Sequence, residues 1–380
     1  SMRALIFRKK RSFLTFLLSL SCQGMCHDAV EARLSELEEK IDQVYTETVY
    51  GQCGLSLSSA FPDLIDNNSW SFSSSLLVWQ LFENKTTYAI VDNTSAFTGS
   101  VHEGFSTRNE FDWAVGYRIG IGYNFFYNPR SCSNWDVQFQ YTYFHTHESD
   151  RAASNSDFPV DFGVISVAFP SAISGSVEYA LAIQKWRVKF LTFDLDIGDH
   201  LFFTHNLSFR PFCGLKGALI FQHVNAQFLN ALSSPLDQRL AHNDFRGIGL
   251  TTGADAYYHF NSNWSLFNSF TSSLLFGKFH IKSLLNNNDP ARVGLILNFS
   301  NLIHNTTRVL PQIQNIFGLS WEKDILGDST HITFRVGYEL QYWWGQNQFN
   351  HFLASVPYLY SQNNGDLSIQ GVNIDLKIDF

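Results

Sequence analysis

The feature that most constrains this chain is a two-residue alternation of apolar and polar side chains, repeated in long stretches up to Phe380. Successive side chains of a β-strand point to opposite faces, so this period indicates strands. Residues 111–123, 135–145 and 332–344 alternate in this way. In the last stretch one face carries Val372, Ile374, Leu376, Ile378 and Phe380. The sequence therefore predicts an extended sheet rather than a helical fold.

Composition and strand length distinguish a membrane sheet from a soluble one. Aromatic residues make up 16% of the chain and charged residues also only 16%, whereas soluble domains carry about 25% charged residues. The apolar faces run for about nine to thirteen residues, the length that a tilted strand needs to cross a bilayer. Trp and Tyr sit near strand ends, as in aromatic girdles, and the opposite faces are polar or glycine. We therefore predict an all-β transmembrane antiparallel β-barrel with a hydrated interior, rather than a soluble β-sandwich.

Ten segments qualify as strands: 70–82, 111–125, 135–146, 184–197, 202–221, 245–260, 264–281, 308–321, 331–344 and 367–380. Four joins between them are short: 126–134, 198–201, 261–263 and 322–330. Five joins are long and polar: 83–110, 147–183, 222–244, 282–307 and 345–366. Short turns on one side and long loops on the other are typical of outer-membrane barrels. Long joins can hide further strands in pairs, so we predict an even strand number between ten and sixteen for a barrel over residues 70–380.

The N-terminal residues are typical of an export signal. Five basic residues precede a short apolar core, Phe13 to Leu20, which is followed by small residues. We predict a signal peptide over 1–24, cleaved between residues 21 and 26; a short buried helix and a lipoprotein signal at Cys22 are the alternatives. The net charge is −8, and removing this segment makes it more negative. This balance argues against a nucleic-acid partner, because phosphate binding needs a basic face.

Residues 28–48 follow a helical period. An apolar seam recurs every three or four residues over two heptads, formed by Val30, Leu34, Leu37, Ile41 and Val44. Two alternatives remain open for this periplasmic helix. It either brings protomers together into a homo-oligomer such as a trimer, or it is a lone amphipathic helix. Residues 49–69 form a linker.

The polar strand faces hold the candidate site residues. We predict that the pore is lined by Arg118, Arg210, Lys216, Arg335 and Glu339. Charged rings at a constriction select ions by sign. The functional interpretation is that cations and carboxylates face each other across the pore and create a transverse field. The alternative is that these groups are ordinary wet residues that neutralise one another.

Catalytic and cofactor motifs are missing from the sequence. It has no HExxH, GxSxG or Walker pattern, and we predict a non-enzyme without cofactor or metal. His145, His147, Glu148 and Asp150 form a candidate metal set, but the start of a solvated loop is the favoured interpretation. The five cysteines show no zinc spacing, and their disulfide pairing does not follow from the sequence.

The strand sequences also resemble a known family, the major outer membrane proteins of the Legionella type with relatives in chlamydia-like bacteria. The similarity covers most of 70–380 and rests on these segments: Leu76 to Gln80, Gly116 to Tyr123, Trp135, Tyr141 to Phe144, Arg210 to Phe212, Gly214 to Ala218, Asp244 to Leu250, Gly337 to Glu339, Trp343 to Trp344, Gln346 to Gln348 and Gly371 to Phe380. The aromatic end at Phe380 resembles the signal that outer-membrane assembly machinery reads. The resemblance implies a pore-forming barrel, an abundant surface protein and an adhesin.

These observations lead to two functional hypotheses for a protein of the bacterial outer membrane. The first is a porin that lets small hydrophilic solutes or ions diffuse through a water-filled barrel among the outer-membrane lipids. The second is a surface adhesin or interaction protein, anchored by the barrel, whose external loops bind host or envelope partners. An outer-membrane hydrolase is a more distant alternative, because no motif singles out a Ser–His pair.

Overall fold

The computed structural model describes residues 69–84, 87–92, 104–108, 110–128, 133–153, 165–166, 181–204, 206–229, 235–261, 263–287, 302–325, 330–352, 360–362 and 365–380. The signal peptide predicted over 1–24 and the helix predicted over 28–48 lie outside these residues, as does the linker except for its last residue. No helix among the described residues is long and apolar enough to cross a membrane.

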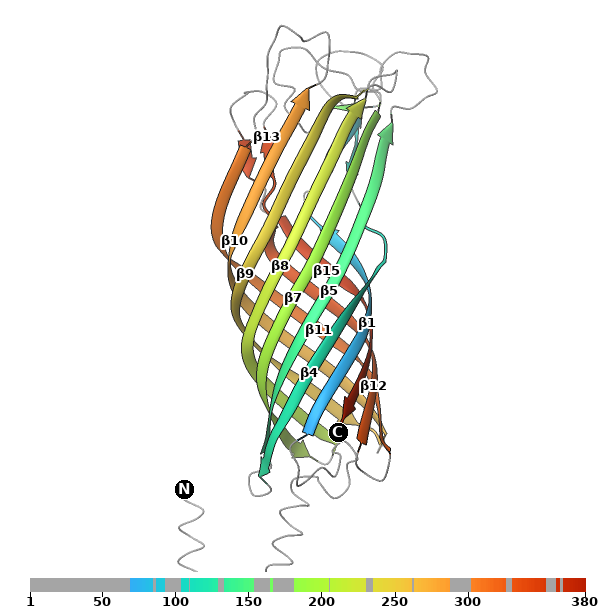
Figure 1. Cartoon of the computed structure of the whole chain (residues 1–380). Helices are drawn as coiled ribbons and strands as arrows, with labels where there is room; N and C mark the ends of the chain where they lie inside the picture. The colour runs from blue at the N-terminus through green and yellow to red at the C-terminus, as the bar shows by residue number, and fades with distance from the viewer. Residues whose placement is uncertain are drawn as a thin grey trace, which may run out of the picture. The chain divides into compact units, whose positions relative to one another are not determined.

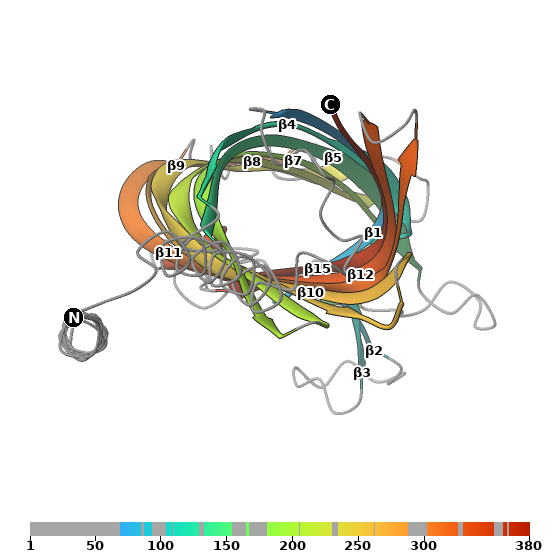
Figure 2. The same cartoon turned by 90° about the horizontal axis from the view of Figure 1, so that it is seen from below.

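Ten antiparallel strands close into a barrel (Figures 1 and 2). In chain order they are β1 (Ser69–Glu83), β4 (Ala114–Asn128), β5 (Ser133–Ala153), β7 (Leu181–Thr204), β8 (Leu207–Leu229), β9 (Pro235–His259), β10 (Trp264–Asn287), β11 (Leu302–Ile325), β12 (Thr330–Asn347) and β15 (Gly365–Asp379). Each of the ten predicted segments lies in one of these strands or overlaps most of it. The predicted all-β barrel with an even strand number is confirmed, and the number is ten.

Strand β1 closes the ring because it pairs on both of its edges. Val78 pairs with Val372 of the last strand on one side and with Val115 of β4 on the other. Beyond the last pair, the backbones of Trp70 and Phe380 exchange two hydrogen bonds of 2.9 and 3.0 Å, and Phe380 stacks on Phe72 with ring centroids 5.5 Å apart. Along β1, the sheet therefore has no unpaired edge of the kind that an open sheet would expose.

Two small sheets lie outside the ring. The first joins β2 (Thr87–Asp92), β3 (Gly104–Arg108) and β6 (Ile165–Ser166), and the second pairs β13 (Asn350–Phe352) with β14 (Tyr360–Gln362). The hydroxyl of Tyr88 in β2 donates a 3.0 Å hydrogen bond to Asp150 of β5. Burial and the negative charge of Asp150 raise the pKa of Tyr88. The long joins therefore do hold extra strands, but none of those described enters the barrel wall.

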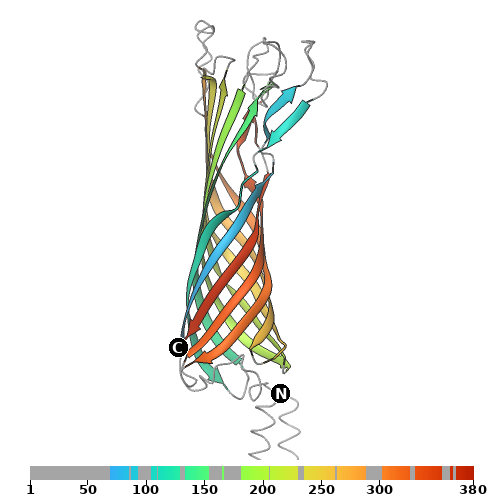
Figure 3. The ribbon, with the colours of Figure 1, turned by 90° about the vertical axis from the view of Figure 1, so that its right-hand side faces the viewer.

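The two ends of the barrel differ (Figures 1 and 3). At one end, here called the turn end, consecutive strands are joined by few residues, as between β7 and β8. At the other, the loop end, strands β7 to β11 of 23 to 25 residues extend beyond β1, β4 and β15, which have 15 each. The predicted long join at 222–244 is wrong, because β8 continues to Leu229 and β9 begins at Pro235.

The outer face of the barrel carries an apolar belt. Its most exposed side chains include Leu250 at 70% and Val115 at 64%. Further members are Phe72, Ile119, Leu195, Leu215, Ile248, Leu274, Phe276, Val309, Phe317 and Leu376. So large an exposed apolar surface is unstable in water and marks contact with a membrane.

Candidate functional site

The interior changes character along a single strand. The inward-facing residues of β1 are first Ser69, Ser71, Ser73 and Ser75, and then Leu77, Trp79 and Leu81. The serines lie toward the turn end, where Ser71 pairs with Asp379, and Trp79 lies toward the loop end. Toward the loop end, the interior of the other strands is dominated by buried apolar side chains such as Phe190, Ile220 and Phe279, with a few buried polar ones such as Gln222 and Asn243 between them. We call the two parts of the interior the polar half and the apolar half.

The polar half encloses a cavity of about 230 Å³, here called the charged vestibule. Four of the five predicted pore residues line it: Arg118, Arg210, Lys216 and Arg335. Glu339, the fifth, is fully buried and accepts a hydrogen bond of 2.8 Å from Arg118. All five therefore face the interior, as their strand faces indicated, while their role in a pore stays a prediction.

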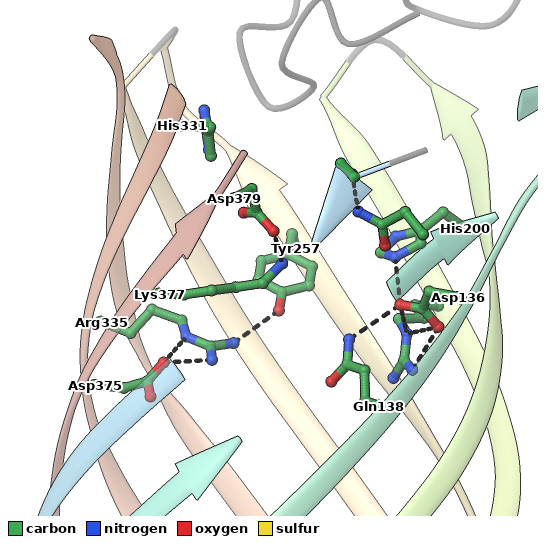
Figure 4. Close-up of polar contacts among 12 residues, drawn as sticks. Asp136, Gln138, His200, Tyr257, His331, Arg335, Asp375, Lys377 and Asp379 are labelled. Carbon is green, nitrogen blue, oxygen red and sulfur yellow. Dashed lines mark hydrogen bonds and ion pairs between the residues drawn. The ribbon is translucent and has the colours of Figure 1, made fainter. Parts of the chain in front are cut away.

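Among the described residues, Arg210 of β8 is the centre of the largest ion-pair cluster. Its guanidinium lies 2.7 Å from Asp136, 2.6 Å from Asp196 and 3.1 Å from Asp255. The Nε2 atom of His200 lies 3.2 Å from the same Asp136, to which Gln138 also donates (Figure 4). One arginine thus holds three carboxylates from three strands. Such charges are tolerated in a protein interior only when each is paired and hydrogen-bonded.

A second ion pair joins two strands that are three positions apart around the ring. Arg118 of β4 donates to Glu339 of β12 and, through Nε, to Thr142 at 3.0 Å. Three side-chain amides complete the shell of the carboxylate: Gln314 and Gln341 at 2.7 Å and Asn373 at 3.1 Å. The Arg118 guanidinium carbon also lies 5.7 Å above the ring of Trp79. This pair therefore marks the boundary between the polar and apolar halves.

A third cluster lies on β12 and β15 (Figure 4). Arg335 donates through Nε to Asp375 at 2.8 Å and through Nη1 to the hydroxyl of Tyr257 at 3.1 Å, on the far side of two intervening strands. Next to it, Lys377 and Asp379 lie 2.9 Å apart. Carboxylates outnumber lysines and arginines among the buried and cavity-lining residues: Asp136, Asp194, Asp196, Asp255, Glu322, Glu339, Asp375 and Asp379 against Arg118, Arg210, Lys216, Arg239, Arg335 and Lys377.

An aromatic layer closes the interior above the vestibule. It consists of Trp79, Phe111, Phe144, Trp186, Phe190, Trp343 and Phe349, all at most 4% exposed. Phe190 of β7 contacts both Trp343 and Trp79, with ring centroids 5.4 and 6.4 Å apart. Five strand-to-strand steps separate β7 from β12 on either path around the ring, so these two strands face each other and their contact crosses the lumen. The predicted hydrated interior is therefore wrong for this half of the barrel.

Residues 346–349, here called the inward segment, follow the last regular pairs of β12. A register shift separates Trp343 from Asn347, and Gly345 has a φ of 66°, a backbone conformation suited to glycine. Asn243 of β9, three strand-to-strand steps from β12 around the ring, donates to the Gln346 carbonyl at 2.9 Å. The Phe349 ring meets Trp186 at 5.6 Å. The segment is buried at 0 to 4% exposure, and Phe349, which lies beyond the end of β12 at Asn347, completes the aromatic layer.

Sequence reasoning found the cations of the vestibule and overlooked the aromatic layer. The signal was present: Leu76 to Trp79 and Trp343 to Trp344 are apolar on both faces, which a strand with a wet side does not need. The candidate metal set is not brought together, because His145 and His147 face outward while Glu148 and Asp150 face inward. No group of three potential metal ligands occurs among the described residues.

A closed antiparallel ring with an apolar belt outside and charged groups inside defines an outer-membrane β-barrel protein. Residues 65–380 match the family of the Legionella pneumophila major outer membrane protein precursor. The chain belongs to this family and is located in the bacterial outer membrane.

Comparisons with individual proteins add little beyond the family. No curated protein matches the chain. Among solved structures, the outer membrane protease OmpT of Escherichia coli is 10% identical with a TM-score of 0.40, covering 83% of this chain and 97% of that one. The toluene transporter TodX of P. putida is 9% identical with a TM-score of 0.26, covering 87% and 92%. At these values the activities of those proteins do not transfer to this chain.

Proposed function

We propose that this protein is a narrow outer-membrane porin for ions and small hydrophilic solutes, with a preference for cations, and that the aromatic layer closes it in the conformation described. The observation that carries this proposal is the charged vestibule, a cavity of about 230 Å³ lined by charged side chains inside the barrel. An excess of carboxylates along a path favours cations. No chemical step is involved.

The strand number supports a narrow path. Barrels of about eight strands are just wide enough to be filled by side chains, whereas 16 to 18 strands leave an aqueous channel. Ten strands lie near the lower limit, so a few large side chains suffice to close this lumen. Opening then requires movement of the side chains of the layer, including Phe349, which contacts Trp186 and lies beyond the end of β12.

Single-channel recording in planar bilayers tests the proposal. Trp343→Ala, which removes a fully buried ring of the layer, should give stable ohmic steps or raise their frequency at least tenfold over the unmodified protein. Trp344→Ala is the matched control, because the adjacent Trp344 is 39% exposed on the outer face. Phe349→Ala should behave like Trp343→Ala. If all these proteins are correctly folded and silent, the porin proposal is wrong.

A second candidate is a surface interaction protein anchored by the barrel. The observation that favours it is the extension of β7 to β11 beyond β1, β4 and β15, together with the small sheet of β2, β3 and β6 outside the ring. Silent bilayers combined with specific retention of the folded protein on a host-cell or envelope surface would favour this candidate. Homo-oligomers through the predicted N-terminal helix remain a prediction for either function.

A further inference from the structure

Basic side chains gather on the outer face of the barrel where the apolar belt ends. Five residues that are register partners on adjacent strands form one continuous row across β5, β7, β8, β9 and β10: His147, Arg187, His223, His242 and Lys282. Every position in this row is a histidine, an arginine or a lysine. Register partners lie about 4.8 Å apart, so the row is roughly 20 Å wide.

The neighbouring rows toward the turn end extend this surface. One contains His145, Lys189, Phe221, Asp244 and His280, and the next contains Tyr143, Leu191, Leu219, Arg246 and Lys278. On β7, Lys185 is the next outward-facing residue beyond Arg187 toward the loop end. We call the basic residues of these positions the cationic collar: His145, His147, Lys185, Arg187, Lys189, His223, His242, Arg246, Lys278, His280 and Lys282. The single acidic residue within these three rows is Asp244.

The collar begins directly where the belt stops. The next row toward the turn end is apolar throughout: Tyr141, Phe193, Gly217, Ile248 and Phe276. Ile248 and Phe276 are exposed at 62% and 64%. Arg246 lies 5.6 Å over the ring of Phe221, so its charge is held at this boundary. A lipid lying against the barrel would therefore place its acyl chains against the apolar side chains and its headgroup against the cations.

We infer that the cationic collar binds the phosphorylated headgroup of a glycolipid in the outer leaflet of the membrane. Loop length places the loop end outside the cell, and the collar stands at the loop-end border of the belt. At this level the headgroups of the outer leaflet surround the barrel. The collar has six lysines or arginines and five histidines around one carboxylate. This positive surface attracts phosphate groups and does not attract neutral headgroups.

The arrangement of the histidines also supports binding of an anion. The rings of His223 and His242 lie 4.3 Å apart, and His223 lies 3.5 Å from Asp244. The rings of His145 and His147 stack at 6.1 Å. Crowding of basic groups on an exposed surface carries a repulsive cost, which a bound polyanion removes.

Binding to purified lipopolysaccharide tests the inference. The full-length barrel, stripped of bound lipid in a neutral detergent, is titrated with phosphorylated lipopolysaccharide and with the same preparation after enzymatic dephosphorylation. The phosphorylated form should bind at least tenfold more tightly. Each Lys or Arg near a charged surface contributes about 1 kcal/mol, which is about fivefold, so Arg187→Gln with Lys282→Gln should weaken binding about 25-fold.

Lys323→Gln is the matched control, since Lys323 is an exposed outward lysine of β11 near the turn end, and it should leave binding unchanged. Equal binding of the two lipid preparations, or binding that the double variant does not weaken, would overturn the inference. A soluble sulfated oligosaccharide distinguishes the source of the anion. If that oligosaccharide binds the collar and the lipid does not, the surface serves a soluble or cell-surface polyanion and the lipid assignment is wrong.

Discussion

Phe190 of β7 and Trp343 of β12 meet edge to face across the lumen, with ring centroids 5.4 Å apart and neither side chain exposed. Because this contact joins facing strands, the aromatic layer stabilises the barrel in addition to closing its lumen. Aromatic pairs of this geometry add about 0.5 to 1.5 kcal/mol beyond the burial of their surfaces.

Phe190→Ala should lower the free energy of unfolding by about 3 to 5 kcal/mol, because it leaves a cavity among rings that cannot collapse together. The measurement is reversible urea unfolding in lipid vesicles, followed by tryptophan fluorescence. Phe193→Ala is the control on the same strand, where the side chain is 38% exposed on the outer face and a smaller loss is expected. Equal losses in the two variants would contradict a packed layer at Phe190.

Ion selectivity should depend on the arginines of the vestibule. In the Trp343→Ala background, replacing Arg118 and Arg335 by Ser removes two cations from a lumen already rich in carboxylates. The reversal potential measured in a salt gradient should therefore move closer to the equilibrium potential of the cation. Arg246→Ser, on the outer face, should leave it unchanged. An unchanged reversal potential in the double variant would show that the two arginines do not line the conducting path.

Arg210 should be the most sensitive charged position of the interior. Arg210→Gln leaves Asp136, Asp196 and Asp255 without their shared cation. Breaking a buried pair on one side costs about 3 to 5 kcal/mol, so folding yield and resistance to thermal unfolding should both fall. Adding Asp136→Asn should recover part of the loss, because one unpaired buried charge is then removed. A double variant as unstable as the sum of the two single changes would argue against this coupling.

Lipid binding by the cationic collar should depend on pH, because five of its eleven basic residues are histidines. A bound phosphate favours the charged form of histidine, so binding of the phosphorylated lipid should tighten between pH 7.5 and 5.5. Binding that is independent of pH would remove the histidines from the proposed contact.

A side chain at Gly345 should destabilise the protein. At φ 66° an added Cβ costs about 1 to 2 kcal/mol, so Gly345→Ala should lower the thermal midpoint or release the inward segment. Gly217→Ala is the control, because the nearest atom to a Cβ there is 3.8 Å away. If both variants melt like the unmodified protein and remain closed, the turn at Gly345 does not hold the segment.

The sequence allowed the ring to be predicted because a period of two assigns each residue of a strand to one face. Arg118 and Arg335 could therefore be placed inside from their neighbours along the strand. The aromatic layer could not be placed in this way, since Trp79 and Trp343 touch partners on strands that are far apart in the sequence. Their meeting depends on strand number and register, which one strand does not encode.

The cationic collar was hidden for the same reason. Arg187, His223 and Lys282 are distant in the sequence, and each is unremarkable on its own strand. They line up only when the register of four strand pairs is known. The length of β8 and β9 was underestimated because their outer ends are polar, and polar residues between strands normally indicate a loop.

The unequal heights of the strands change what the sheet can join. The last pair between β4 and β5 at the loop end is Gly116 with Phe144, and pairing of β11 with β12 begins at Gln312. Beyond these points, among the described residues, 145–153 and 302–311 are each paired on one side only. Over the described residues, the barrel therefore continues as an open sheet of six strands in which these two segments are the edges. An edge strand can pair with a further extended strand through its backbone amides and carbonyls, so these two segments are where the sheet can grow.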